Sequence, residues 1–324
     1  MALANIFAFL VRIRSGYLYM KVSLLSFGIA LSTFALTTNM SAAPQQLGAE
    51  ARTKQTFGNG KLVMTLQPST EAGIINGFFM LKFNGAGRWD YGWTEVDFEY
   101  VPGNNDAWRP TAEGSCGPNG QPCQIGQLNG QSAADFISVN IIGGPLTGPP
   151  VRDSQVFYRL GRAYFEATNT YTFAWTPDQV MWSASGVNNN LPFMYQNPGN
   201  QQNDIHQSAG LNFLAGRQMN IRLNCYSGLG YNGSFGGTGV IPTANTEMVV
   251  QMVAFYPLIN GQFSAVPSMS SDFVNGKYTL NNAASTFDAI WDKILSNDNP
   301  VYLRPENVSV QQGKGLVLSY KYIR

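Results

Sequence analysis

Charged residues, histidine and cysteine are all scarce in this 324-residue chain. Lys, Arg, Asp and Glu together make up 12% of the sequence, about half of their usual share, which disfavours salt-bridged helices and coiled coils. The net charge of +1 does not indicate nucleic acid or an anionic membrane as a partner. One histidine, His206, and three cysteines are too few for a usual zinc site. We therefore expect no metal bound through His or Cys.

Glycine, proline and aromatic residues are plentiful, with 34 Gly, 17 Pro and 13% aromatics. Short stretches rich in β-branched and aromatic residues follow one another, and turn residues bound most of them. They cover residues 61–66, 78–83, 94–101, 136–142, 171–175, 180–183, 219–223, 248–256 and 316–322. The pattern predicts an all-β fold. The only helical spacing lies in residues 287–294, with Ser285 as a candidate N-cap.

The N-terminus has the pattern of an export signal. Lys21 is followed by an apolar run over residues 22–36 and by small residues at 41–43, which predicts a signal peptide over residues 1–43, with translation starting at Met1 or Met20. A membrane anchor is the alternative, but a run of about fifteen residues is short of the roughly 20 that span a bilayer. Cleavage leaves residues 44–324 as a single secreted or periplasmic domain.

Export bears on the three cysteines. In an oxidising compartment Cys116 and Cys123, which lie in a loop rich in Gly, Pro, Asn and Gln, are candidates for a disulfide, and two free thiols are the alternative. That loop, residues 102–134, is long enough to border a binding site. Cys225 lies in an apolar stretch without a His partner, so we expect a buried, inert thiol.

Three acidic residues alternate in the segment after Trp93. On a strand, Glu95, Asp97 and Glu99 share one face at about 6.6 Å intervals, and the residues between them face the core. Solvated strand faces usually mix acids with Lys, Thr and Ser, whereas this face carries acids only. We call these three residues the acid row and interpret it as functional, with a solvated amphipathic strand as the alternative.

Carboxyls in such a row suit glycoside chemistry. Retaining glycosidases place a nucleophile and an acid/base about 5–5.5 Å apart. The backbones of Glu95 and Glu99 are roughly 13 Å apart, but their long side chains can lean together over a sugar. Asp97 is shorter and lies between them. By sharing a proton with a neighbour, it can keep one Glu ionised as the nucleophile and the other protonated as the acid.

The string Glu-Val-Asp-Phe-Glu at 95–99 resembles the E-x-D-x-E signature of glycoside hydrolase family sixteen, which includes lichenases and xyloglucan transglycosylases. Residues 73–79, 169–182 and 222–226 resemble further segments of that family, so the resemblance covers most of residues 53–256. It implies a β-jelly-roll sandwich of two antiparallel sheets with a concave substrate cleft. By resemblance Glu95 is the nucleophile, Asp97 the assisting acid and Glu99 the general acid/base.

The order of the family's segments is unusual. A strand segment that opens the domain in ordinary lichenases has no counterpart after residue 43, and a similar segment lies within residues 270–324. The chain thus resembles circularly permuted members of the family. An appended C-terminal module is the alternative, but about 55 residues with one or two strands would struggle to form a core.

The resemblance also proposes residues that contact sugar. They are Phe79, Trp93, Asn140, Arg222, Asn224, Tyr226 and Tyr231. Ser138, Tyr226 and Asn169 depart from the family pattern, and Val250 stands where an Asp often completes a structural calcium site, so bound calcium is not supported. The implied protein is a monomeric endo-β-glucanase without a cofactor, whose partner is a β-1,3-1,4-glucan or a related β-glucan, with no nucleic acid and no stable membrane association. A transglycosylase and a non-catalytic glucan-binding lectin are the alternatives.

Overall fold

The structure is a computed structural model. It describes residues 45–82, 94–102, 136–143, 151–152, 156–159, 162–177, 179–185, 194–196, 218–227, 242–297 and 302–323, which belong to one compact unit. The predicted signal peptide, Trp93, Cys116, Cys123, His206 and Tyr231 lie outside these residues. No helix among the described residues is long and apolar enough to cross a membrane.

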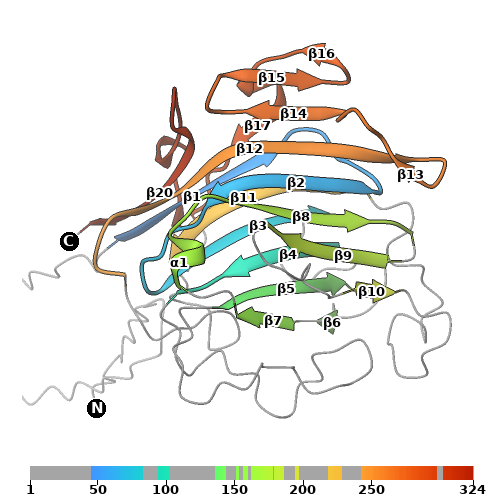
Figure 1. Ribbon diagram of the computed structural model, residues 1–324. Helices are drawn as coiled ribbons and strands as arrows, with labels where there is room; N and C mark the ends of the chain where they lie inside the picture. Colours follow the sequence, from blue (N-terminus) through green and yellow to red (C-terminus); the bar gives the residue numbers. More distant parts are fainter. Residues whose placement is uncertain are drawn as a thin grey trace, which may run out of the picture. The chain divides into compact units, whose positions relative to one another are not determined.

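A first antiparallel sheet carries the acid row. Its strands lie in the order β17 (Trp291–Lys293), β1 (Gln45–Thr53), β11 (Asn220–Ser227), β3 (Ile74–Lys82), β4 (Thr94–Tyr100) and β5 (Phe136–Gly143), with the short β6 (Val151–Arg152) and β7 (Val156–Arg159) beside β5. β4 therefore has a paired strand on each side (Figure 1).

A second antiparallel sheet is centred on two long strands. Its order is β16 (Ala283–Ala284), β15 (Lys277–Leu280), β14 (Met269–Asp272), β12 (Thr246–Ile259), β2 (Gly60–Gln67), β8 (Asn169–Trp175), β9 (Gln179–Ala184) and β10 (Met194–Gln196). β12 continues into a hairpin with β13 (Gln262–Phe263), whose turn residues Asn260 and Gly261 have φ of 51° and 79°. This Asn-Gly pair suits a tight hairpin turn.

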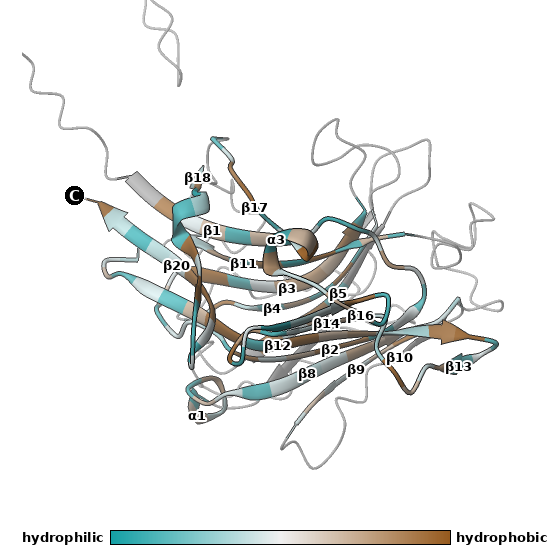
Figure 2. Cartoon of the chain, turned by 90° about the horizontal axis from the view of Figure 1, so that it is seen from above, coloured by the Kyte–Doolittle hydropathy of each residue, from teal (hydrophilic) through white to brown (hydrophobic). Residues whose placement is uncertain are grey.

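The two sheets pack face to face around an aromatic core (Figure 2). Phe98 of the first sheet lies 5.6 Å from Tyr171 and 6.2 Å from Phe173 of the second, measured between ring centroids. Phe78, also of the first sheet, lies 4.9 Å from Tyr171. All four rings are fully buried. The predicted all-β sandwich of antiparallel sheets is confirmed.

The C-terminal strand joins the sheets. β20 (Gly315–Ile323) pairs through residues 316–320 with β12 of the second sheet and through residues 321–323 with β1 of the first. β19 (Val308–Gln311) forms a hairpin with β20, and β18 (Tyr302–Leu303) pairs in parallel with β1. The C-terminal segment is thus part of the sandwich. The circular permutation, which concerns chain order relative to other proteins, stays a prediction.

Several strands were not predicted, of which β1 is the longest, and one helix was predicted too long. β1 escapes recognition because Glu50 and Arg52 interrupt its small inward-facing residues. The helix α3 spans only Phe287–Ile290, and its N-cap is Thr286, not Ser285. The predicted extent was wrong because the next three residues form β17, where pairing with β1 overrides the helical spacing. The other described helices are also short, α1 (Arg162–Phe165) and the 3₁₀ helix η2 (Pro305–Asn307).

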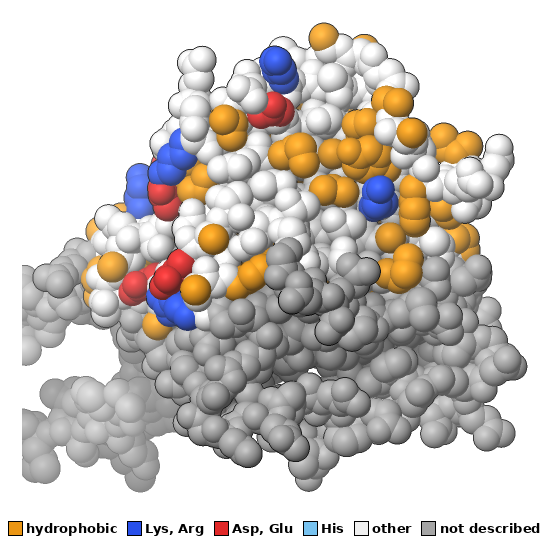
Figure 3. All heavy atoms as spheres, in the orientation of Figure 1, with side chains coloured by type: hydrophobic (Ala, Val, Ile, Leu, Met, Phe, Trp, Pro, Cys, Tyr) orange, Lys and Arg blue, Asp and Glu red, His pale blue; other side chains and the backbone are white. Residues whose placement is uncertain are grey.

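The outward face of the second sheet carries little charge. Hydrophobic side chains gather on it over β12, β2 and β8, around a basic side chain (Figure 3). The most exposed of the large apolar residues near the β12–β13 hairpin are Ile259, at 55%, and Val266, at 59%. A contiguous exposed apolar patch of this kind is a common mark of an interaction surface.

Candidate active site

The acid row occupies one face of β4. Val96, Phe98 and Tyr100 of the same strand are fully buried in the core between the sheets, so the alternating acids project from the other face. Even there they are largely buried: Glu95 is 9% exposed, Asp97 0% and Glu99 7%. The alternative of a solvated amphipathic strand does not fit this burial.

The strand register places Asp97 fourth in a row of residues that crosses five strands. The row runs through Arg52 of β1, Arg222 of β11, Phe79 of β3, Asp97 of β4 and Asn140 of β5. Three of the residues proposed to contact sugar thus lie on the face of the acid row. The side chain of Asn140 is fully buried, and neither its amide nitrogen nor its oxygen has a hydrogen-bond partner among the described residues. A buried polar group without a partner is unusual, which makes Asn140 a candidate to bind a polar group of a ligand.

A parallel row passes through Glu99. It contains Glu50 of β1, Asn224 of β11, Gly77 of β3, Glu99 of β4 and Ser138 of β5. The main-chain N–H of Gly77 donates to Oδ1 of Asn224 at 2.9 Å. A Cβ at position 77 would lie 2.5 Å from that oxygen, which is closer than real Cβ contacts allow. Gly77 therefore lets the Asn224 side chain lie across β3 toward the strand that carries Glu99.

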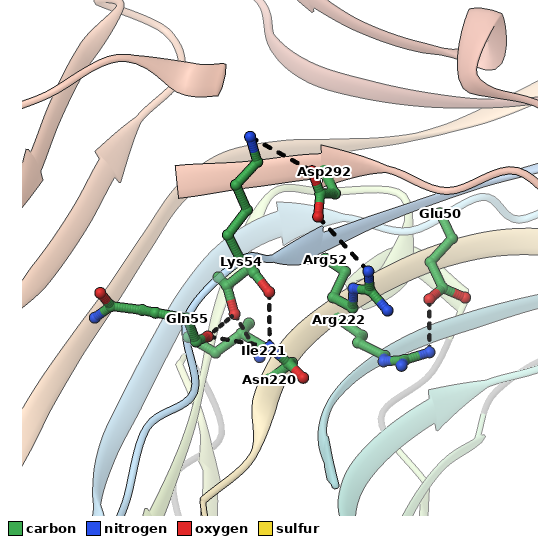
Figure 4. A network of polar contacts seen from close by, with 9 residues as sticks. Glu50, Arg52, Lys54, Gln55, Asn220, Ile221, Arg222 and Asp292 are labelled. Carbon is green, nitrogen blue, oxygen red and sulfur yellow. Dashed lines mark hydrogen bonds and ion pairs between the residues drawn. The ribbon is translucent and has the colours of Figure 1, made fainter. Parts of the chain in front are cut away.

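A buried ion pair adjoins these rows and was missed in the sequence. Arg222 Nη1 donates to Glu50 Oε1 at 3.0 Å, with side chains 13% and 8% exposed (Figure 4). Next to it, Asp292 lies 3.6 Å from both Arg52 and Lys54, and these three groups are more exposed. Removing one partner of a buried pair leaves an uncompensated charge, so Glu50 holds the Arg222 guanidinium in place. The alternation of Ala49 and Ala51 with charged residues could have placed Glu50 on this face, but it does not identify Arg222 as the partner.

The second sheet supports the acid row from the core side. Trp182 of β9 is 1% exposed, and its indole N–H donates to the main-chain oxygen of Asp97 at 3.0 Å. This bond links the two sheets directly under the central acid. It ties the backbone of β4 to a rigid, buried side chain.

Two further residues of β11 next to the site are buried. Tyr226, proposed to stack on sugar, follows Asn224 on the same face but is 7% exposed and packs with Ile75, Val101 and Leu303 in a small apolar cluster. Cys225 points into the main core, and burial raises the pKa of its thiol to about 12. The predicted burial of this thiol is confirmed, and a raised pKa disfavours the reactive thiolate. Among the described residues, no group of three or more His, Cys, Asp or Glu side chains is arranged to hold a metal ion.

The comparisons with known proteins give structures but no sequence relatives. No protein-family model matches the chain, and no curated protein sequence matches it. A native glycosidic hydrolase is 17% identical, with a TM-score of 0.36, over 58% of this chain and 60% of that chain, which is less than two thirds of its length. The Bacillus licheniformis β-glucanase is 18% identical, with a TM-score of 0.37, over 62% of this chain and 74% of that one. The Bacteroides ovatus mixed linkage glucan PUL GH16, in complex with G4G4G3G product, is 17% identical, with a TM-score of 0.39, over 65% and 80%. Such low identities and TM-scores assign no role to any residue of this chain.

Proposed function

We propose that this protein is a secreted, endo-acting, retaining β-glucanase that hydrolyses mixed-linkage β-1,3-1,4-glucan or a related β-glucan. The observation that carries the proposal is the acid row itself. Three carboxyls share one face of a central strand, largely buried, between Asn140 on one side and Asn224 and Arg222 on the other. Carboxyls are the groups that glycoside cleavage requires, as nucleophile and as acid/base.

The chemistry follows a double displacement. Protonated Glu99 gives its proton to the glycosidic oxygen, and the Glu95 carboxylate attacks the anomeric carbon as the bond to the leaving sugar breaks. Glu99, now ionised, takes a proton from water, whose oxygen attacks the same carbon and releases Glu95. Asp97 lies between them and helps to keep one glutamate ionised and the other protonated. Two inversions at one carbon retain the β configuration.

The surroundings of the acid row support a neutral, hydroxyl-bearing substrate. Asn140 offers both a donor and an acceptor without a partner among the described residues, and Asn224 is held by Gly77. The Arg222 cation is already paired with Glu50, so it adds hydrogen-bond donors without a net charge that would select an anionic polymer. A chain that carries only 12% charged residues is consistent with such a substrate.

The decisive experiment measures new reducing ends on barley mixed-linkage glucan, laminarin and xyloglucan, with and without acceptor oligosaccharides. We expect hydrolysis of at least one β-glucan, and loss of it in the matched Glu95→Gln variant. Proton NMR in the first minutes should show β-anomer at the new reducing end, before mutarotation. Early α-anomer would contradict the mechanism. Products extended by the acceptor without new reducing ends would indicate a transglycosylase, and binding without any turnover a lectin.

Export and oligomeric state belong to the same proposal. Expression with the full N-terminus should yield a monomer that starts at residue 44, because the small residues at 41–43 fit a cleavage site. N-terminal sequencing and light scattering check the two points. A product that keeps its N-terminus and stays in the membrane fraction would favour an anchor.

A further inference from the structure

The outward face of the second sheet carries an ordered row of side chains that the acid row does not use. The register places Tyr256 of β12, Lys61 of β2, Ala174 of β8 and Met181 of β9 directly beside one another, and we call these four residues the outer row. Tyr256 and Lys61 are partly exposed, and Met181 is 36% exposed. The outer row therefore crosses four strands at right angles to their direction.

Two aromatic rings flank the one charged side chain of the outer row. Lys61 Nζ lies 4.8 Å from the ring centroid of Tyr256 and 6.0 Å from that of Phe263, which belongs to the β12–β13 hairpin. Both distances are within the range of cation–π attraction, so the ammonium and the rings form one group. Phe263 is also partly exposed.

The next row on the same face carries no charge and offers hydroxyls. It contains Ala254, Val63, Thr172 and Ser183, in register across the same four strands. The surface thus combines rings, small side chains, the hydroxyls of Tyr256, Thr172 and Ser183, and one ammonium. An outward sheet face that meets only water usually carries more charge than this.

This combination favours one class of occupant. Nucleic acid and anionic membranes are bound by clusters of several basic residues, and the outer row has one. A β-glucan presents C–H faces, which pack on the electron-rich faces of aromatic rings, and hydroxyl rims, which hydrogen bond to ammonium and hydroxyl groups. The length of an extended glucose unit is also close to the strand spacing of about 4.8 Å, so successive sugars can follow successive strands.

We propose that the outer row, together with Phe263, is a second β-glucan-binding surface. It lies on the outward face of the second sheet, whereas the acid row lies on the outward face of the first, and between these faces is the core. Tyr256 and Phe263 contact the sugar rings, and Lys61 and the neighbouring hydroxyls bind the rims. This surface holds the protein on the polymer while the acid row cleaves. The identity of the polymer rests on the proposed function.

The test separates polymer binding from cleavage. Binding to barley mixed-linkage glucan is measured by affinity electrophoresis. Every variant carries Glu95→Gln, which leaves the polymer intact. Tyr256→Ala or Phe263→Ala is added to this background. Tyr302→Ala is the matched control, because Tyr302 is also a partly exposed ring beside a cation, 5.9 Å from Arg304. Thermal unfolding confirms that each variant is folded. The two substitutions change outward-facing or hairpin residues, so at least one is expected to fold.

We expect Tyr256→Ala or Phe263→Ala to weaken polymer binding about fivefold to tenfold, and Tyr302→Ala to leave it unchanged. With Glu95 restored, Tyr256→Ala should hydrolyse a short aryl oligosaccharide, which fills only the acid-row site, within about twofold of the unsubstituted enzyme. Equal polymer binding by all variants would overturn the inference, as would a dimer that Tyr256→Ala converts to a monomer. A protein that cleaves no glucan, yet loses polymer binding with Tyr256→Ala, would refute the proposed function and support this surface.

Discussion

The indole N–H of Trp182 and the main-chain oxygen of Asp97 are joined by a hydrogen bond of 3.0 Å that connects the two sheets. The bond lies within the buried core side of β4, and the carboxyls project from the opposite face. The backbone position of Asp97 is therefore held by a residue on the core side of β4, away from the carboxyls. If the acid row acts as proposed, Trp182 positions it without contacting the sugar.

Replacing Trp182 with Phe should leave the Asp97 carbonyl without this donor. We expect a loss of about 1–3 kcal/mol in the free energy of unfolding and a fall in kcat of about tenfold, with a smaller change in KM. Trp175→Phe is the matched control, since Trp175 is fully buried in the same sheet and its indole nitrogen has no hydrogen-bond partner among the described residues. Equal effects of both substitutions on kcat would show that only ring volume matters.

The two glutamates of the acid row should respond differently to a small anion. Glu99→Ala should still form the glycosyl-enzyme from an aryl glycoside with a good leaving group, and azide should then release a β-glycosyl azide. Glu95→Ala lacks the nucleophile, so azide should enter from the vacated face and give the α-azide. Asp97→Asn should keep a little activity. NMR of the azide products decides the assignment, and the reverse pattern would exchange the two roles.

A side chain at position 77 should be incompatible with the present position of the Asn224 side chain. Gly77→Ala brings a Cβ within 2.5 Å of Asn224 Oδ1, and we expect a destabilisation of about 1–3 kcal/mol with a loss of most activity. Adding Asn224→Ala removes the clash and should restore stability but not activity. Urea unfolding and kcat/KM of the single and double variants check this. Recovery of both properties in the double variant would mean that Asn224 takes no part in the reaction.

The ion pair between Glu50 and Arg222 should contribute more to stability than the neighbouring exposed pairs. Glu50→Gln keeps a hydrogen-bond acceptor but removes the counter-charge of the largely buried Arg222 guanidinium, and should cost about 1.5–3 kcal/mol. Asp292→Asn is the control, because its contacts to Arg52 and Lys54 are 3.6 Å long and over a third exposed, and it should cost at most about 1 kcal/mol. Similar values in urea unfolding would argue against a structural role for the buried pair.

The circular permutation predicts that the chain can be reordered. Deleting residues 285–324 should prevent soluble folding, because β20 pairs with both β12 and β1 and its loss exposes sheet edges. A gene that places residues 285–324 before residue 44 through a short linker should restore the fold and the activity, because this cut lies between β16 and α3. A truncated protein that stays folded and active would show that the segment is an appended module.

Local alternation was enough to predict much of this molecule. The runs of β-branched and aromatic residues marked the strands around the core, and the spacing of Glu95, Asp97 and Glu99 marked their common face. The missing parts depend on distant partners. The ion pair of Glu50 with Arg222 joins residues 172 positions apart, and the bond from Trp182 to Asp97 spans 85 positions. Neither leaves a local pattern. β1 was missed because small alanines, which pack well against a crowded core, carry little strand preference.

Cys225 gives this fold a built-in reporter of its own opening. The thiol is completely buried, and its pKa of about 12 keeps it protonated at neutral pH, so a thiol reagent can react only when the sandwich separates around β11. When Cys116 and Cys123 are changed to serine, Cys225 is the only thiol left. Its labelling rate then measures the free energy of this opening. β11 also carries Arg222 and Asn224. The labelling rate of Cys225 with and without glucan would therefore show whether a bound glucan slows the opening of the sheet.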